Sequence, residues 1–332
     1  MSHRQLKGVS SATLGIYRHW LTVWVEWRAK SNLATQIPAV GIDDLRAFFH
    51  YLAKDHIPHQ HNTKRPPAKK RGLEPSSSAG CWRVLRAFWR FLADEGALVG
   101  DQARYFTGDR IPCPRVPVQV REAGDRDSLD ALLAACGDRL DDEESVRNRV
   151  ILLLLYESGM RVSELCRLRD HEIRIGQETA LVTGKGNKQR WAFWGPRGTE
   201  ALLRYLRVRR GPIGGPLIRG VSTRNNGNAM TRDAVRACLK RLAKRAGVKL
   251  PAGAPVHWFR HGFAHAALDA GLDVSQLAQL LGHADIETTM RYVREHPGRL
   301  RDIHAKIFRT NKNGEEQRSS LGYVAPRRAA DQ

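Results

Sequence analysis

Along most of the chain, apolar residues recur at the three- and four-residue spacing of amphipathic helices, which predicts a mostly helical protein. Two short β-prone runs, residues 179–183 and 189–194, flank the turn Gly184-Lys185-Gly186-Asn187-Lys188 and predict one hairpin with a lysine at its tip. The expected fold class is therefore mostly α with a small β-hairpin (α+β). The predicted helices cover residues 13–30, 42–54, 79–95, 128–136, 143–157, 162–168, 199–209, 231–247 and 274–281.

Breaks in this pattern divide the chain into domains. Residues 55–78 are polar, basic and proline-bearing, which predicts a loop whose final serines cap the next helix. Residues 100–124 lose periodicity and carry three prolines, as in a semi-extended linker. One core rarely grows past about 250–300 residues, so 332 residues predict two domains. The expected parts are a helical domain at 1–110, a linker at 111–124, a second domain at 125–309 and a polar tail at 310–332.

Near the end of the second domain, the pattern places a histidine and a tyrosine on one turn-and-helix unit. Gly282 follows the helix at 274–281 where a left-handed cap is expected, and Asp285 stands at an N-cap position. On a helical wheel Tyr292 lies about 120° from an apolar stripe, so we expect it to point off the core face, near His283. The residues of that stripe are Ile286, Met290 and Val293.

The net charge of the chain limits the kinds of partner that we expect it to bind. Formal net charge is +21, and both parts contribute, with 18 basic against 9 acidic residues in 1–116 and 37 against 25 in 117–332. Such an excess predicts a polyanionic partner, most naturally nucleic acid, although a charge that only aids solubility is the alternative. Candidate phosphate contacts lie in the 55–78 loop, on one face of the 79–95 helix and on the 231–247 helix: Lys64, Arg65, Lys69, Lys70, Arg71, Arg83, Arg86, Arg90, Lys240, Arg241 and Lys244.

Other classes of site find little support. Five cysteines stand far apart without a CxxC pair, which fits a reducing cytoplasm rather than a zinc ribbon or disulfide framework. The histidines at 56, 59 and 61 have no nearby cysteine or acidic cluster to complete a metal site. Those at 257, 261 and 265 flank Arg260, whose charge would repel a metal. No run approaches the ~20 apolar residues of a membrane span. We expect a cytoplasmic protein without metal or cofactor.

Several side chains that could take part in catalysis stand at the ends of the predicted elements. Each of them, taken alone, could equally serve an ordinary structural role. The motifs SGMRVSEL, TGKGNKQR, HWFRHGFAHAAL and LLGHADIETTMRY, in this order across residues 156–294, resemble those of the tyrosine recombinase (phage integrase) family, including Xer-like and plasmid or transposon recombinases. The N-terminal helices are similar, more weakly, to the core-binding domain of that family. The matching residues are Arg161, Lys185, His257, Arg260, His283 and Tyr292.

The resemblance implies a two-domain, C-shaped clamp on double-stranded DNA and a division of chemical roles. The two arginines and His283 would bind the non-bridging oxygens of a phosphodiester. Tyr292 would attack phosphorus and form a 3′-phosphotyrosyl link, His257 would accept its proton, and Lys185 would protonate the departing 5′-oxygen. Glu164 is expected to brace the elbow that carries Arg161.

An assembly is implied as well. Four protomers on two recombination sites would exchange strands through a Holliday junction, with a possible need for an accessory DNA-bending protein or a second recombinase. Residues 295–309 are expected to form a helix that docks on the neighbouring protomer. Three alternatives stay open: a monomeric type IB topoisomerase, a catalytically silent DNA-binding protein on the same fold, and a metal-dependent transposase.

Overall fold

The structure is a computed structural model that divides into two compact units, residues 1–119 and 120–332. Within the described residues, no helix is both long and apolar enough to cross a membrane. The structure describes residues 9–58, 71–117, 122–139, 141–211, 213–221, 227–251, 255–283 and 285–294. The helix expected at 295–309 and most of the basic run in the 55–78 loop lie outside these ranges.

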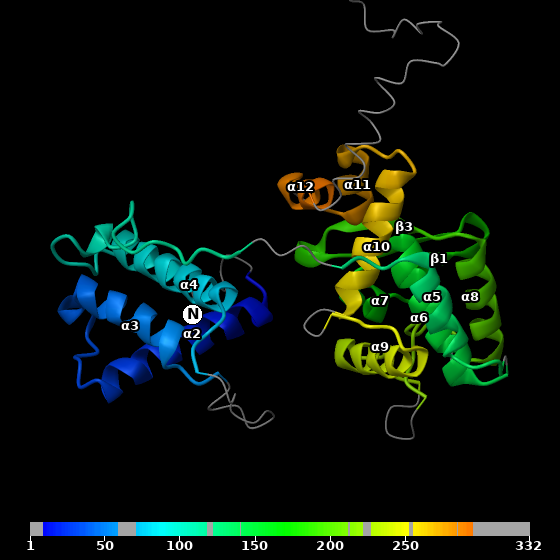
Figure 1. The fold of residues 1–332 in the computed structure, drawn as a ribbon, viewed down its shortest axis with the longest axis horizontal. Coiled ribbons are helices and arrows are strands. Elements are labelled where there is room, and N and C mark those ends of the chain that lie inside the picture. The colour runs from blue at the N-terminus through cyan, green and yellow to red at the C-terminus, as the bar shows by residue number, and fades with distance from the viewer. Residues whose placement is uncertain are drawn as a thin grey trace, which may run out of the picture. The chain divides into compact units, whose positions relative to one another are not determined.

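The first unit is helical, as the apolar spacing predicts. Its core packs Trp24 against Trp89, with ring centroids 5.6 Å apart, and both side chains are buried. The helices are α2 (Ser11–Lys30), α3 (Ile42–Lys54) and α4 (Pro75–Asp94), with short 3-10 helices at Ile37–Ala39 and Gln102–Arg104 (Figure 1).

One predicted boundary in this unit is wrong. The helix expected at 79–95 begins at Pro75, and its N-cap is Glu74 rather than a serine. Proline is favoured in the first helical turn, because its fixed φ suits the helix and its missing N–H would have no intrahelical partner there. The three serines therefore lie inside the first turn of α4.

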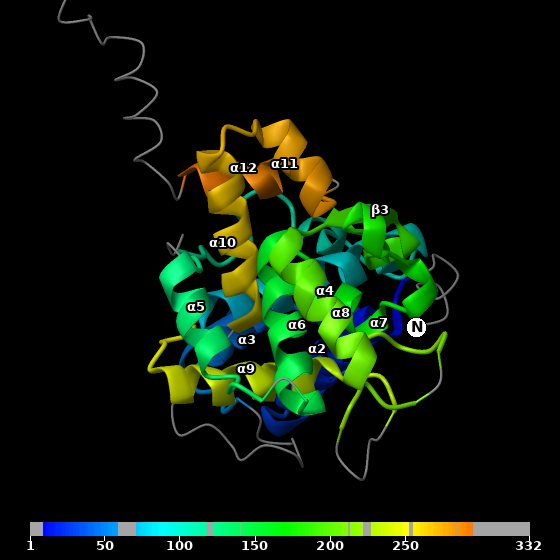
Figure 2. The same ribbon diagram turned by 90° about the vertical axis from the view of Figure 1, so that its right-hand side faces the viewer.

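The second unit surrounds the long apolar helix α6, whose run of aliphatic residues is buried on nearly all sides. Figures 1 and 2 show α11 and α12 together at one end of this unit, beside α10. Its helices are α5 (Arg126–Ala134), α6 (Glu143–Ser158), α7 (Val162–Arg167), α8 (Pro196–Val208), α9 (Arg232–Ala246), α10 (Pro255–Asp269), α11 (Val274–Leu281) and α12 (Glu287–Arg294).

A small antiparallel sheet, of order β1-β2-β3, completes the unit. Strands β2 (Thr179–Thr183) and β3 (Gln189–Phe193) form the predicted hairpin, with Val182 opposite Arg190. Strand β1 (Ile173–Arg174) is too short to be seen in the apolar pattern. The remaining 3-10 turns are Asp170–Glu172, Ile175–Gln177 and Lys185–Asn187. The prediction of a mostly helical protein with a small sheet is confirmed.

Gly159 ends α6 and sets the direction of the chain into the arginine elbow. Its φ is +59°, and a Cβ placed there would lie 2.5 Å from Phe263 Cδ1. Gly159→Ala should therefore lower the free energy of unfolding by about 2 kcal/mol or more, through left-handed strain and overlap together. Gly247→Ala is the matched control, since Gly247 has φ +66° with open space around its Cα. Urea denaturation compares them, and an equal loss in both variants would contradict the packing argument.

Candidate active site

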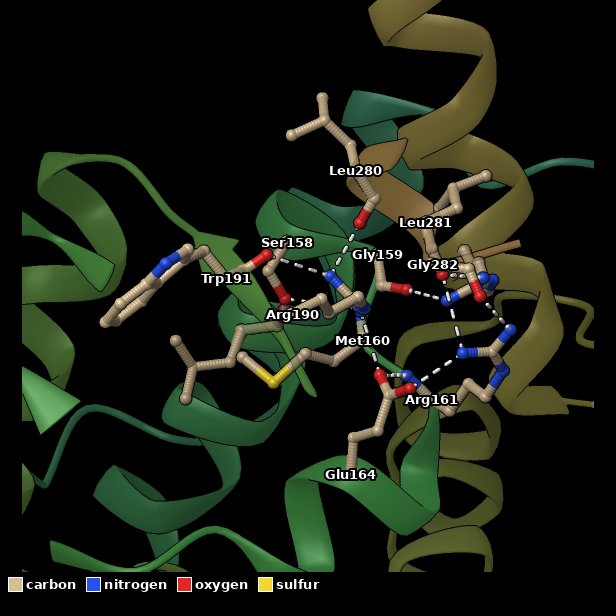
Figure 3. Close-up of polar contacts among 12 residues, drawn as sticks. Ser158, Gly159, Met160, Arg161, Glu164, Arg190, Trp191, Leu280, Leu281 and Gly282 are labelled. Atoms are coloured by element: carbon tan, nitrogen blue, oxygen red, sulfur yellow. Dashed lines mark hydrogen bonds and ion pairs between the residues drawn. The ribbon is translucent and has the colours of Figure 1, made fainter. Parts of the chain in front are cut away.

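Arg161 stands at the elbow between α6 and α7, where its own sequence neighbours hold it. It is the N-cap residue of α7, and Glu164, three residues on, closes a reciprocal cap. The Arg161 backbone N–H donates to Glu164 Oε2 at 2.9 Å, and Arg161 Nη1 donates to Glu164 Oε1 at 2.7 Å (Figure 3). The Glu164 side chain is fully buried. These contacts agree with the expectation that Glu164 braces the elbow.

A second guanidinium, that of Arg260 on α10, meets the first at the C-terminal end of α11. Arg260 is buried and donates from Nη1 to Gly159 O and from Nη2 to Leu281 O, both at 2.6 Å. Arg161 reaches the same helix end at 3.4 Å, through Leu281 O and Gly282 O. The last carbonyls of a helix have no intrahelical partner and carry partial negative charge. They hold both guanidiniums side by side.

His283 follows this helix end directly and contacts Arg260. Its Nε2 lies 2.9 Å from Arg260 Nη2, and its Nδ1 lies 2.7 Å from the Oγ1 of buried Thr289. A guanidinium only donates, so Nε2 must accept and the proton of the neutral ring is assigned to Nδ1. Burial, and then the nearby arginines Arg260 and Arg161, lower the pKa of His283 to about 4. The ring is therefore neutral at pH 7 in the DNA-free protein.

This lowered pKa predicts how stability depends on pH. A histidine with a pKa near 6.5 in the unfolded chain binds protons there more readily than in the fold. The stabilising contribution of neutral His283 is complete above pH 6.5 and is lost as the pH falls toward 4. We expect His283→Asn, which cannot titrate, to flatten the fall in unfolding free energy between pH 6.5 and 4. Urea denaturation across this range checks it, and parallel pH profiles would contradict the assignment.

Tyr292 lies on α12 and is buried, contrary to the helical-wheel prediction. Its exposure is 2%, and it packs with Leu277 and Leu281 in a small apolar cluster between α10, α11 and α12. Ile286, expected to face the core, is instead 51% exposed. A wheel gives relative angles around a helix but not which arc meets the neighbouring helices, and here the arc of Tyr292 does.

The ring of Tyr292 is framed by histidines. It lies parallel to the His283 ring, with centroids 6.3 Å apart and an interplanar angle of 6°. His261, on α10, meets it edge-on at 5.0 Å. Because His283 also contacts Arg260, the candidate nucleophile and the arginine pair belong to one centre.

Positive charge dominates this centre. Three guanidiniums lie in it: those of Arg161 and Arg190 pair with the carboxylate of Glu164, whereas that of Arg260 contacts His283. Burial, and then Arg161, lower the pKa of Arg260 to about 10, while Tyr292 acts in the opposite direction. Arg260 therefore stays charged at pH 7. Three guanidiniums with one carboxylate among them carry excess positive charge, which favours binding of an anion with several acceptor oxygens.

The remaining two candidate catalytic residues, Lys185 and His257, lie on elements that also carry residues of this centre. Lys185 begins the turn of the β2–β3 hairpin, and a Cβ on the preceding Gly184 would lie 3.3 Å from Glu164 Oε1, so this turn lies against the arginine elbow. The side chain of Lys185 is outside the described atoms. His257 is exposed in the first turn of α10, one turn before Arg260.

Three residues of the centre were missed by sequence reasoning. Arg190 binds Glu164, Thr289 binds His283, and His261 packs on Tyr292. For Arg190 a signal existed, because alternation along β3 places it on the same face as buried Ala192. Thr289 and His261 had no comparable signal.

The candidate DNA-contact residues are scattered over both units. On α4, the three arginines are exposed on the face opposite buried Leu85 and Trp89, and Arg86 lies over the Trp82 ring at 5.2 Å. On α9, the three basic residues are exposed, and Arg241 pairs with Glu144. Arg71 is exposed, whereas Lys64, Arg65, Lys69 and Lys70 lie outside the described residues. In the described part of the chain, no group of histidine, cysteine and acidic residues has the arrangement of a metal site.

Comparison with known proteins adds a family to this geometry. Residues 125–299 match the phage integrase family. The chain is 31% identical over 302 residues to tyrosine recombinase XerD of Ralstonia nicotianae, covering 90% of this chain and 89% of that protein. It is also 31% identical over 310 residues to XerD of Xanthomonas axonopodis pv. citri, covering 90% and 92%.

Two solved structures share the fold at low identity. The Tn1549 transposon integrase in complex with transposon right-end DNA has a TM-score of 0.67 at 17% identity, over 91% of this chain and 96% of that one. XerH recombinase bound to palindromic difH substrate has a TM-score of 0.66 at 17% identity, over 91% and 82%. At this identity they support the two-domain architecture.

Proposed function

The chain belongs to the phage integrase family and is a tyrosine site-specific recombinase, and from this premise we propose that Tyr292 cuts and rejoins DNA at one centre with Arg161, Arg260 and His283. The observation that carries the proposal is the convergence of two guanidiniums, an imidazole and a phenol around a site with excess positive charge. A phosphodiester entering this site meets paired donors for its non-bridging oxygens.

The proposed reaction is a transesterification in which every bond and proton is accounted for. The Tyr292 Oη–P bond forms as the bond from phosphorus to the 5′-oxygen breaks, leaving a 3′-phosphotyrosyl link and a free 5′-hydroxyl. The phenol proton passes to His257, and an ammonium proton of Lys185 passes to the departing oxygen. The phosphotyrosyl ester keeps the bond energy, so a 5′-hydroxyl from another strand reverses the step without ATP.

His283 has a state-dependent role in this proposal. In the DNA-free structure its Nε2 accepts from Arg260, which leaves no proton there for a phosphate. A bound phosphate draws the arginine donors toward its own oxygens, and its negative charge offsets the arginine charge that lowers the pKa of His283. Proton uptake at Nε2 then supplies a third donor to the phosphate.

On DNA we propose a homotetramer that pairs two recombination sites and passes through a Holliday junction. Support for a DNA site comes from the fold neighbours, which are an integrase with transposon-end DNA and a recombinase with its difH substrate. Support within this chain comes from its charge of +21 and the exposed basic stripes on α4 and α9. The exposed arginines of α4 would contact phosphates and set the position of the protein on the duplex.

The test is a plasmid assay with the recombination site, which is first located by binding to DNA that flanks the native gene. In the presence of a chelator, a plasmid with two sites in direct repeat should resolve into two circles. Relaxation of a one-site plasmid without resolution would favour a topoisomerase, and binding without any product a silent DNA-binding protein. Loss of activity on chelation would favour a metal-dependent transposase.

A further inference from the structure

Arg190 on β3 makes contacts that join the hairpin to both halves of the arginine centre. Its side chain is 10% exposed and donates from Nη2 to Glu164 Oε2 at 2.8 Å. From Nη1 it donates to Leu280 O at 2.6 Å and to Trp191 O at 3.3 Å. Figure 3 shows this guanidinium between the end of α11 and the carboxylate of Glu164. One side chain thus links β3, α7 and the helix end that precedes His283.

Glu164 is shared between two arginines, so its position depends on both. Oε1 accepts from Arg161 Nη1, and Oε2 accepts from Arg190 Nη2 and from the Arg161 backbone. Burial opposes ionisation of this carboxylate, but Arg190 and Arg161 together outweigh it and hold the pKa of Glu164 below its usual range. Removing Arg190 would leave Glu164 anchored from the α7 side alone.

Gly282 leaves room for the Arg190 side chain to reach Glu164 and the end of α11. A Cβ on Gly282 would lie 2.6 Å from Arg190 Cδ, so the side chain crosses directly over the glycine before His283. In the hairpin, Gly184 N donates to Lys188 O at 2.8 Å, and Gly184 lies against Glu164. The turn that begins at Lys185 is therefore fixed to the elbow through the Arg190–Glu164 pair at the base of the hairpin.

We propose that Arg190 is a positioning residue for leaving-group protonation, because it fixes the hairpin of Lys185 against the arginines that bind the phosphate. The inference rests on the proposed function, in which Lys185 protonates the 5′-oxygen. A lysine at position 190 keeps the charge but is a single point donor, so it cannot bind Glu164 and the Leu280 carbonyl as a rigid fork does. Displacing a proton donor by about 1 Å is enough to slow a reaction by about 100-fold.

A substrate with sulfur in place of the bridging 5′-oxygen tests this role, because a thiolate departs without a proton. Single-turnover cleavage is measured at saturating protein on this substrate and on the all-oxygen DNA. We expect Arg190→Lys to cut the all-oxygen DNA about 100-fold more slowly than wild type, and the sulfur substrate within about twofold of it. Lys185→Ala should show the same pattern.

Arg209→Lys is the matched control, because Arg209 is a buried arginine that binds Asp170 through both of its terminal nitrogens. It should lower stability and leave the ratio of the two cleavage rates at the wild-type value. DNA affinity and thermal unfolding are measured for every variant. If Arg190→Lys is unfolded at the assay temperature, Arg190→Gln, which retains one amide donor, takes its place with the same expected pattern.

The outcomes distinguish a failure of the inference about Arg190 from a failure of the proposed function on which it rests. Slow cleavage of both substrates by Arg190→Lys, with Lys185→Ala restored by sulfur, would overturn the role of Arg190 alone. Wild-type cleavage of the all-oxygen DNA by Arg190→Lys would overturn it too. If sulfur fails to restore Lys185→Ala, Lys185 is not the proton donor, and that part of the proposed function fails together with the inference.

Discussion

Tyr292→Phe should abolish recombination while leaving DNA binding and the fold unchanged. The substitution removes one hydroxyl group and keeps the ring that packs among Leu277, Leu281 and the neighbouring histidines. Without the nucleophile there is no covalent route, so the rate should fall by about 10⁶-fold, below detection. Resolution of the two-site plasmid measures the activity, and gel retardation on the isolated site measures binding.

Tyr205→Phe provides the matched control for a lost buried hydroxyl. Tyr205 belongs to the same unit, is fully buried, and accepts a hydrogen bond from the Arg219 backbone N–H at 3.2 Å. Its variant should lose about 1 kcal/mol of stability and still recombine. Persistent recombination by Tyr292→Phe would contradict the assignment of the nucleophile.

The next largest effect is expected for Arg260→Lys. Arg260 binds two carbonyl oxygens and contacts His283 while facing the proposed phosphate site, and a lysine cannot make these contacts together. Loss of one paired donor to the transition state should slow cleavage by about 10³-fold. Single-turnover formation of the covalent adduct on a nicked duplex measures this step.

A buried arginine outside the centre shows whether that loss is specific. Arg219 is also fully buried and donates to two carbonyl oxygens, those of Pro216 and Arg210. Arg219→Lys should therefore destabilise the unit to a similar degree and leave the cleavage rate of the folded protein near wild type. Equal rate losses in both variants would mean that Arg260 acts through stability rather than at the phosphate.

The sequence predicts the parts of this centre that local signals determine. Capping by Gly282 and the turn between β2 and β3 follow from residue types at fixed spacing, and the structure has both. The elbow of Arg161 also follows locally, since Glu164 lies three residues along the same chain segment. The membership of the family was visible in the order of four motifs.

Long-range packing decides what the sequence could not predict. Arg161 and Arg260 converge because the carbonyls at the end of α11 accept hydrogen bonds from both. Gly282, one of the acceptors for Arg161, lies 121 residues away from it in the sequence. The burial of Tyr292 depends on which arc of α12 meets α10 and α11, and the link from Arg190 to Glu164 depends on where the sheet packs. Alternation along β3 shows which face Arg190 occupies, but no pattern within a single segment shows which distant residues its side chain, or that of Arg260 or Tyr292, will meet.

Covalent trapping on DNA tests the central claim most directly. A duplex nicked near the cleavage position loses the short fragment that carries the 5′-hydroxyl, so the phosphotyrosyl link cannot reverse. With chelator present, wild-type protein should form a detergent-stable adduct at the 3′-phosphate, and mass spectrometry of the digested adduct should find the nucleotide on Tyr292. An adduct on another residue, or attachment through a 5′-phosphate, would contradict the account.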